Sequence, residues 1–333
     1  MKNALALAAA LVLAACSPPP QPEAAGPGSA ETPAPALALT VLSERLAPAV
    51  PARREVGWAV RDLTNGAAAG QNQTLPYPMQ SVFKLWLAAY VLEAAERGEL
   101  RLDETITVTR ADLGFPYQPI AKKVDADGYE ATIEELVRYI VIDSDNPSAD
   151  ILLRRIGGPT VLTAWLRARG VEGISVDSNE RQMHDAAGAM RAAPKAERPA
   201  LLDASLTDGR NAATPEAAVE ALARLHRGEL LSPGATRRLL AIMAETRTGT
   251  NRVKAGLEPG WRWAHKTGSG GEMDGRSLGV NDVGLLTAPD GRVYAVAIFI
   301  AGTTEPQAVQ EAWMADIARG VIAQWQADTG RAR

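Results

Sequence analysis

Apolar residues recur along this chain with two spacings, one typical of helices and the other typical of strands. Apolar positions three or four residues apart predict a helix near the start, several through the middle and one at the end. The predicted helices are 37–50, 83–96, 133–142, 161–168, 196–205, 215–227, 233–245 and 307–326, and another begins at Asn146-Pro147. Short apolar runs bounded by turn residues predict strands at 56–60, 263–266, 282–286 and 292–300.

The order of these elements predicts the fold. An Asn65-Gly66 turn after the first strand indicates a hairpin and therefore a second early strand. Two early strands and three late ones predict an α/β arrangement: a mixed, mostly antiparallel five-stranded sheet flanked by helices, with an all-α domain inserted between its two parts. We assign residues 37–77 and 232–333 to the α/β domain and residues 78–231 to the all-α domain.

The first residues have the pattern of a targeting segment. Residues 4–15 are apolar without interruption, too short a run to span a bilayer and typical of a signal peptide, which we assign to residues 1–15. Small residues before Cys16 resemble a bacterial lipobox, in which Cys16 would be lipid-modified; an ordinary signal peptide that happens to contain a cysteine is the alternative. Residues 16–36, rich in Pro, Ala and Gly, predict a flexible tether. The folded part is therefore expected to be exported, periplasmic and anchored to a membrane through Cys16.

Composition excludes several classes of protein. The 333 residues include 35 basic and 39 acidic side chains, a net charge of −4, which argues against a nucleic-acid binder. The single cysteine rules out an internal disulfide and a cysteine-based metal site. His184, His226 and His265 show no metal-ligand spacing, so we expect neither a metal nor another cofactor.

The first motif that could carry chemistry is Ser81-Val82-Phe83-Lys84, at the start of the most apolar predicted helix. Residues three apart on a helix lie on one face, so the Lys84 amine can reach the Ser81 hydroxyl. A helix N-terminus also favours negative charge, which suits a serine nucleophile whose attack creates an oxyanion. Alone the motif is weak, because serine and lysine are often three residues apart by chance.

Two further motifs follow in order along the chain. Ser144-Asp145-Asn146 begins 60 residues beyond Lys84, and Lys266-Thr267-Gly268 begins 120 residues beyond Asn146. Each has an ordinary structural explanation, since Asn146 before a proline is a typical helix cap and the last motif is a strand running into a glycine turn. All three motifs in this order are far less expected by accident.

The set of motifs resembles the penicillin-recognising serine acyl-transferases, which comprise penicillin-binding proteins and serine β-lactamases. The spacings and element order are similar to those of a class A β-lactamase from about residue 37 to the end of the chain. Segments 80–84 and 179–183 resemble the extended-spectrum subgroup of the Bacteroides type. Other similar segments are Phe115-Pro116-Tyr117-Gln118-Pro119, Thr248-Gly249-Thr250-Asn251-Arg252 and Asn281-Asp282-Val283-Gly284.

The resemblance implies hydrolysis of penicillins and cephalosporins through a serine acyl-enzyme, and hence antibiotic resistance. By this resemblance, Ser81 would be the nucleophile, and its proton would pass to Lys84 or through a water to Glu180. Ser144 and Lys266 would assist departure of the lactam nitrogen. The backbone N–H groups of Ser81 and Ser269 would form the oxyanion hole. The implied substrate-binding residues are Tyr117, Asn146, Thr267, Ser269 and Arg252, with Arg276 as the alternative guanidinium for the substrate carboxylate.

Glu180 decides between the branches of the superfamily. Both branches acylate the serine, but only a β-lactamase hydrolyses the acyl-enzyme quickly, which in class A requires a glutamate on an irregular loop. The segment around Glu180 shows little regular pattern, as such a loop would. A surface glutamate is the alternative, and the Asn-Glu-x-x-Met pattern at 179–183 favours the catalytic base.

Three features depart from the family pattern. His184 stands where an asparagine usually helps to hold the hydrolytic water, and Ser178 where many members have an arginine that anchors the glutamate-bearing loop. The stretch 186–210 is also longer than usual by about one helix. We expect the loop either to be held by this extra element or to be mobile.

Two other functions stay open at this stage. A D-alanyl-D-alanine carboxypeptidase or transpeptidase would share the acylation residues, although Glu180 argues against it. A ligand-sensing lipoprotein of the same fold would need a long-lived acyl-enzyme and a signalling partner. Under the leading hypothesis the partner is a small-molecule β-lactam, and we expect the protein to be a monomer.

Overall fold

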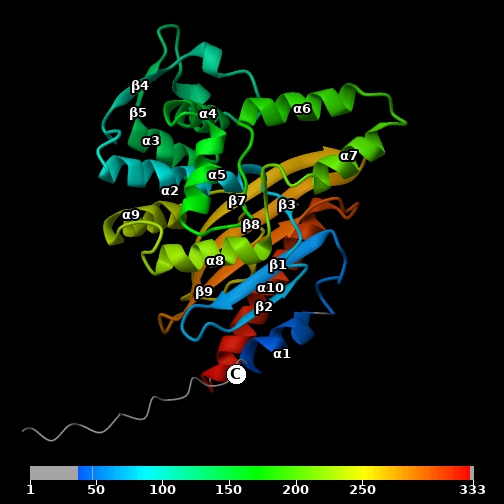
Figure 1. Ribbon diagram of the computed structural model, residues 1–333. Helices are drawn as coiled ribbons and strands as arrows, with labels where there is room; N and C mark the ends of the chain where they lie inside the picture. The colour runs from blue at the N-terminus through cyan, green and yellow to red at the C-terminus, as the bar shows by residue number, and fades with distance from the viewer. Residues whose placement is uncertain (1–36, 47, 331–333) are drawn as a thin grey trace, which may run out of the picture. The chain divides into compact units, whose positions relative to one another are not determined.

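A five-stranded sheet runs through the middle of the computed structural model, which describes residues 37–46 and 48–330 (Figure 1). The strand order is β2-β1-β9-β8-β7, and all neighbouring strands are antiparallel. The strands are β1 (Val56–Asp62), β2 (Ala68–Gln71), β7 (Arg262–Met273), β8 (Arg276–Thr287) and β9 (Val293–Ile300). The predicted sheet from both chain ends is confirmed, and it contains no parallel pair.

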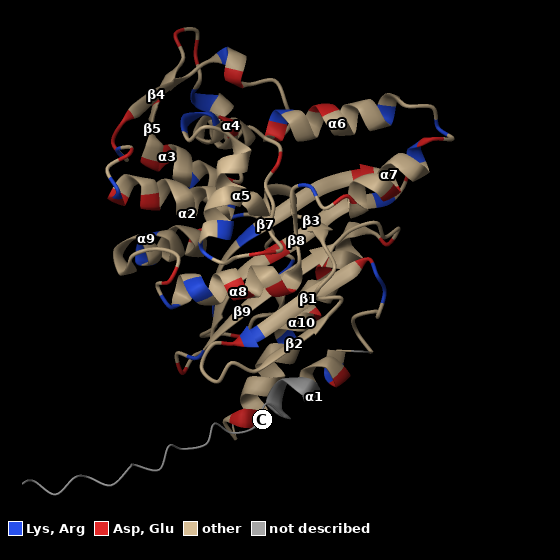
Figure 2. Cartoon of the chain, viewed as in Figure 1, with Lys and Arg blue, Asp and Glu red and all other residues tan. Residues whose placement is uncertain are grey.

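Helices cover both faces of this sheet. Helices α1 (Leu37–Leu46) and α10 (Gln307–Asp328) pack together on one face, and α8 (Pro215–His226) packs against β1 and β9 on the other (Figure 1). The ribbons of the sheet are mostly free of charged residues, which dot the helices and loops instead (Figure 2). Burial of the sheet between two helical layers explains why its strands are apolar runs rather than alternating patterns.

Strand β8 shows how the two cores are divided. Side chains alternate along a strand, so Val283 and Leu285 enter the core shared with the central helices. Val280 and Leu286 point the other way, into the core under α1 and α10. Lys266 of the neighbouring strand β7 pairs with Val283, so its side chain lies on the face of the sheet that is opposite α10.

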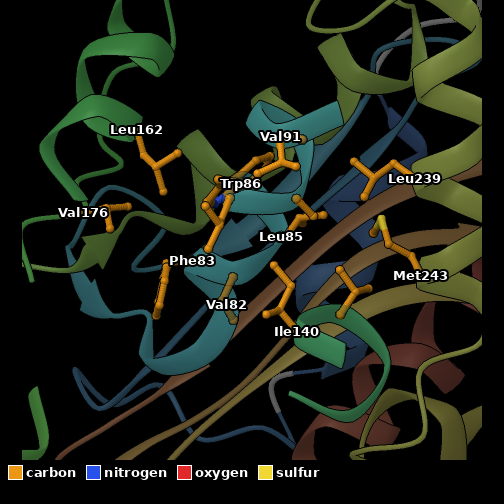
Figure 3. Close-up of a cluster of buried hydrophobic side chains, with 14 of the residues drawn as sticks. Val82, Phe83, Leu85, Trp86, Val91, Ile140, Leu162, Val176, Leu239 and Met243 are labelled. Carbon is orange, nitrogen blue, oxygen red and sulfur yellow. The ribbon is translucent and has the colours of Figure 1, made fainter. Parts of the chain in front are cut away.

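Helix α2 (Phe83–Glu96) is the centre of the helical part. Its side chains are buried almost all round, and Figure 3 shows Phe83, Leu85 and Trp86 surrounded by apolar side chains of other segments, as predicted from its composition. Helices α4 (Asn146–Arg155), α5 (Pro159–Ala168) and α9 (Pro233–Ala244) pack against it. The other helices of this part are α3 (Ile133–Arg138), α6 (Glu180–Ala192) and α7 (Arg198–Thr207). Two small two-stranded sheets pair β3 (Tyr77–Pro78) with β6 (Ala212–Ala213) and β4 (Thr105–Val108) with β5 (Tyr129–Thr132).

The segment leading into α4 differs from the predicted helix cap. The side chain of Asp145, not that of Asn146, accepts the N–H of Ser148 and caps the helix. A π-helical turn, Tyr139–Asp143, precedes it and leaves Ser144 with a φ of 60°. The cap explanation for Asn146 is therefore wrong, and the Asn146 side chain is available to the site.

The segment around Glu180 is also more regular than the sequence indicated. Glu180 is the first residue of α6, which has 13 residues and is capped by Asn179 in a reciprocal arrangement with Gln182. The predicted irregular loop is wrong at this point, because the capping residues begin a helix at Glu180. The helix expected over 196–205 is confirmed as α7.

Several predictions concern residues outside the described ranges. The signal peptide, the tether and Cys16 all belong to residues 1–36. Within residues 37–46 and 48–330, no helix is long and apolar enough to cross a membrane. The boundaries between the α/β and all-α domains stay predictions.

Candidate active site

Ser81 and Lys84 face each other at the start of α2. A short 3₁₀ turn, Gln80–Val82, precedes the α-helix, so Ser81 stands just before the first turn of α2. Lys84 Nζ lies 3.1 Å from Ser81 Oγ, the contact that their spacing predicted. The packing of α2 in the core fixes both side chains, and Lys84 has no exposed surface.

The buried Lys84 ammonium has polar partners from three parts of the chain. It donates to the backbone oxygen of Ser144 at 2.8 Å and to Asn146 Oδ1 at 2.5 Å. It also forms an ion pair with Glu180 Oε1 at 2.7 Å. A buried charge is costly unless it is paired and hydrogen-bonded, so these partners hold the cation beside Ser81.

Glu180 turns its carboxylate toward the serine. Its Oε1 lies 3.3 Å from Ser81 Oγ, and the residue is 9% exposed. The buried carboxylate of Asp150 anchors this end of α6, because it accepts the backbone N–H groups of Glu180 at 2.7 Å and Arg181 at 3.1 Å. Burial raises the pKa of Asp150, while these two N–H donors oppose the shift.

The sequence reading missed Asp150. It lies on α4, four residues after Asn146 and therefore on the same helix face, and that spacing was the only available signal. Its partner segment is 30 residues away in the chain, so the sequence could not reveal what it anchors.

A hydrogen-bonded clamp closes the base of the segment that carries Glu180, next to Ser178. Asn211 Oδ1 accepts the N–H groups of Asp177 at 2.7 Å and Ser178 at 3.0 Å. In return, Asp177 Oδ2 accepts the N–H of Asn211 at 3.1 Å. This clamp joins the chain before α6 to the chain after α7 through hydrogen bonds rather than a salt bridge.

Lys266 reaches the site from β7. Its Nζ donates to Ser144 Oγ and to the backbone oxygen of Thr267, both at 2.8 Å. Burial, reinforced by the positive charge of Lys84, lowers the pKa of the Lys266 ammonium well below its usual value, and Glu180 opposes that shift. The hydrogen bond to Ser144 gives the serine hydroxyl a direct proton partner.

The two candidate guanidinium groups lie in different places. Arg252 is 3% exposed and donates to Ser269 Oγ at 2.6 Å and to the backbone oxygen of Asn281 at 2.7 Å, with Glu311 3.4 Å from its Nε. Arg276 instead donates to the Gly302 backbone oxygen at 3.0 Å and pairs with Asp203 at 2.8 Å. Of the two, only Arg252 has a side-chain hydrogen bond to the Lys266–Ser269 segment of β7.

A cavity of about 320 Å³ opens beside these groups. Asn146, Glu180 and Ser269 line it, as does His184 of α6. Tyr117 is 55% exposed and has a φ of 61°, and its backbone oxygen accepts the N–H of Asn146 at 3.1 Å. Among the described residues, no group of three or more His, Cys, Asp or Glu side chains is placed to hold a metal ion.

Gln80 is a second residue that the sequence reading did not assign a role. Its Nε2 donates to the backbone oxygen of Leu278 at 2.8 Å, and its φ is 49°. A Cβ atom on Gly270 or Gly279 would lie only 2.7 or 2.8 Å from the Gln80 side chain, so both positions require glycine. Gln80 therefore ties the residue before Ser81 to β8, the strand next to the one that carries Ser269.

Comparison with known proteins agrees with this geometry. The Beta-lactamase enzyme family matches residues 42–325. This chain belongs to that family. The extended-spectrum β-lactamase PER-1 of Pseudomonas aeruginosa is 34% identical over 73% of this chain and 73% of its own length.

Solved structures place this β-lactamase in class A. The crystal structure of a β-lactamase from Chitinophaga pinensis is 32% identical, with a TM-score of 0.75 over 88% of this chain and 99% of that one. An ancestral class A β-lactamase, GNCA, is 30% identical, with a TM-score of 0.71 over 86% of this chain and 99% of that one. The predicted family, fold and β-lactam-hydrolysing activity are confirmed.

Proposed function

We propose that this β-lactamase opens its substrate by covalent attack of Ser81, and that Glu180 drives hydrolysis of the acyl-enzyme. The observation that carries the proposal is the position of the Glu180 carboxylate, 3.3 Å from Ser81 Oγ and 2.7 Å from Lys84 Nζ. An enzyme that only acylates has no need of a carboxylate at this point, whereas a hydrolase requires a base for water.

In acylation, Ser81 Oγ would attack the β-lactam carbonyl carbon while its proton passes through a water to the Glu180 carboxylate, or to Lys84 after the Lys84 ammonium has given a proton to Glu180 across their ion pair. Both acceptors lie close enough, so either route fits the distances to Oγ. The backbone N–H groups of Ser81 and Ser269 would stabilise the oxyanion. As the carbon–nitrogen bond breaks, Ser144, bonded to Lys266, would pass its proton to the lactam nitrogen and be reprotonated with the proton taken from Ser81, so that Glu180 is a carboxylate again in the acyl-enzyme.

In deacylation, a water would attack the ester carbon of the acylated Ser81. Glu180 would take one proton from that water, and its hydroxyl would become part of the product carboxylate. Ser81 Oγ leaves and regains a proton, which returns Glu180 to its charged state. Asn146 would meanwhile hold the acylamide side chain of the substrate, with Tyr117 at the rim.

Turnover of a chromogenic cephalosporin tests the proposal. We expect sustained hydrolysis over many equivalents of substrate. The specific alternative is a D-alanyl-D-alanine carboxypeptidase or penicillin-binding protein, which would release one stoichiometric burst of product and then stop.

Arg252 is proposed to bind the substrate carboxylate together with Thr267 and Ser269. Arg252→Ala should lower kcat/KM about 10- to 100-fold, mainly through KM, because a charge-assisted hydrogen bond is lost. Arg276→Ala, which removes the same group from a site facing Asp203, is the matched control and should leave KM unchanged. Equal losses in the two variants would contradict the assignment, and thermal melting separates loss of folding from loss of binding.

The lowered pKa of Lys266 should appear in the pH profile of acylation. Its charge is lost as pH rises through the lowered pKa, so kcat/KM should fall with rising pH before the usual lysine range is reached. Lys266→Arg should retain the charge and remove this limb, because arginine does not titrate there. An unchanged alkaline limb in Lys266→Arg would show that another group titrates.

Penicillins and cephalosporins are the proposed substrates, and the extended-spectrum name of PER-1 supports the cephalosporins. We also propose an exported, periplasmic monomer, tethered by a lipid on Cys16 through residues 17–36; the apolar run before Cys16 supports this. Membrane fractionation of Cys16→Ala tests the tether, since unchanged membrane association would remove it and leave the hydrolytic mechanism intact.

A further inference from the structure

Helices α6 and α7 form an arm that leaves the active site at Glu180 and returns beside the end of the sheet (Figure 1). The cavity of about 320 Å³ lies along this arm, because residues of both helices line it together with Ser269 and Leu278. A second cavity, of about 410 Å³, separates other residues of α7 from β8 and the chain near Tyr77. Cavities therefore lie beside the arm, so the position of the arm depends on the few contacts that attach it to the sheet.

A small apolar cluster makes this attachment. Leu202 of α7, which is 2% exposed, packs with Met273 and Leu278 at the β7–β8 hairpin. Met190 of α6 and Leu206 of α7 complete this set of five side chains, which we name the docking cluster. Leu206 also packs against the core around α2, but Leu202, Met273 and Leu278 belong to neither large core, so truncating one of these three need not unfold the sheet or the helical centre.

Two ion pairs flank the docking cluster. Asp203 pairs with Arg276 at 2.8 Å, and Arg198 lies 3.4 Å from Asp274. The acidic partners are 65% and 38% exposed, and ion pairs open to water contribute little. The apolar contact of Leu202 therefore carries most of the attachment.

We propose that Leu202 is a positioning residue for deacylation: docking of α7 on the β7–β8 hairpin sets the direction of α6 and thereby the place of Glu180. The first turn of α6 is held by Asp150, which accepts two of its N–H groups, and by Met183, which packs against the core around α2. Glu180 is the only buried residue of this helix, so the direction of its exposed remainder depends on contacts at the far end. Met190, near the far end of the same helix, belongs to the docking cluster. A helix of 13 residues is about 20 Å long, so movement at one end is transmitted to the other.

This inference rests on the proposed role of Glu180, and it predicts that the two chemical steps respond differently. Ser81 stands just before α2, Lys84 lies on α2, and Lys266 lies on β7, seven residues before Met273 of the docking cluster, so none of the three belongs to the arm or to the docking cluster. Acylation should therefore survive loss of docking. Deacylation should not, because displacing a catalytic group by about 1 Å can reduce a rate by about 100-fold.

The test compares two neighbouring leucines of α7. Leu202→Ala should slow deacylation about 10- to 100-fold while acylation is unchanged, so that the acyl-enzyme accumulates and is seen by mass spectrometry. Leu201→Ala makes the same chemical change at a position 39% exposed and should behave like wild type. Leu202→Met keeps the apolar volume and should restore deacylation. Met273→Ala removes the cluster from the strand side, should give the same split, and decides the matter if Leu202→Ala does not fold.

Other outcomes distinguish failure of the positioning role of Leu202 from failure of the proposed role of Glu180. Unchanged deacylation, or an equal loss of both steps with a lowered melting temperature, would overturn the positioning role of Leu202. Glu180→Gln in the same assay tests the underlying mechanism. If Glu180→Gln accumulates acyl-enzyme and neither cluster variant does, only the positioning role fails; if Glu180→Gln turns over normally, the proposed base fails with it.

Discussion

Replacing Glu180 with glutamine should trap the enzyme as a covalent adduct with its substrate. Glutamine has nearly the shape of glutamate but cannot accept a proton from water, so deacylation should slow by roughly 10²- to 10⁴-fold. Lys84 would keep its contacts with Ser144 and Asn146, so the nucleophile should remain in place. Mass spectrometry of the intact protein after mixing with a penicillin should show an increase equal to the substrate mass.

The same variant bears on the open question of the acylation base. An adduct that forms at the normal rate would assign the Ser81 proton to Lys84, whereas slow formation would show that Glu180 also acts in acylation. Glu172→Gln is the matched control, because the side chain of Glu172 is 77% exposed and its partner, Arg167, is 3.9 Å away. Wild-type turnover by Glu180→Gln would refute the proposed base.

Replacing Ser81 with alanine should abolish turnover. Removal of a serine nucleophile from a catalytic unit lowers kcat by about 10⁶-fold, and no other hydroxyl bonds to Lys84 Nζ among the described residues. The rate of chromogenic cephalosporin hydrolysis measures the loss, and no acyl adduct should appear.

A matched serine and a binding measurement make this result specific. Ser178→Ala changes a serine that lines the same cavity and should retain activity. A rise in melting temperature with added substrate should show that Ser81→Ala still folds and binds. Substantial residual hydrolysis by Ser81→Ala would point to a different nucleophile.

Residues whose chemistry depends on local spacing were predictable from the sequence. Ser81 and Lys84 lie on adjacent turns, so their contact follows from the helical repeat alone. The apolar composition of α2 predicted that it would be buried, and burial is what holds Lys84 rigidly beside the nucleophile. The separate motifs of Ser144 and Lys266 suggested a shared site only through their resemblance to a family.

Residues whose role depends on a distant partner were not predictable. In the sequence, Asp150 resembles any acidic residue on a helix, because the two N–H groups that it accepts belong to a segment 30 residues later. Gln80 likewise resembles any polar residue before a helix, because its partner, the Leu278 backbone oxygen of β8, is 198 residues away along the chain. Asn146 looked like a cap because the sequence could not show that Asp145 takes that role.

The sequence by itself determined the contact of Ser81 with Lys84, the order of the motifs and the family, and it predicted Ser81 as the nucleophile, because these depend on residue identity and on short or regular spacing. The tertiary structure placed Arg252 beside Ser269 and Arg276 beside Asp203, and it brought Glu180 to Ser81. It also showed that a hydrogen-bonded clamp and the docking cluster hold the long arm. These contacts depend on which side chains come together when distant segments pack. The spacing of two segments along the chain does not indicate whether they will be in contact in the folded protein.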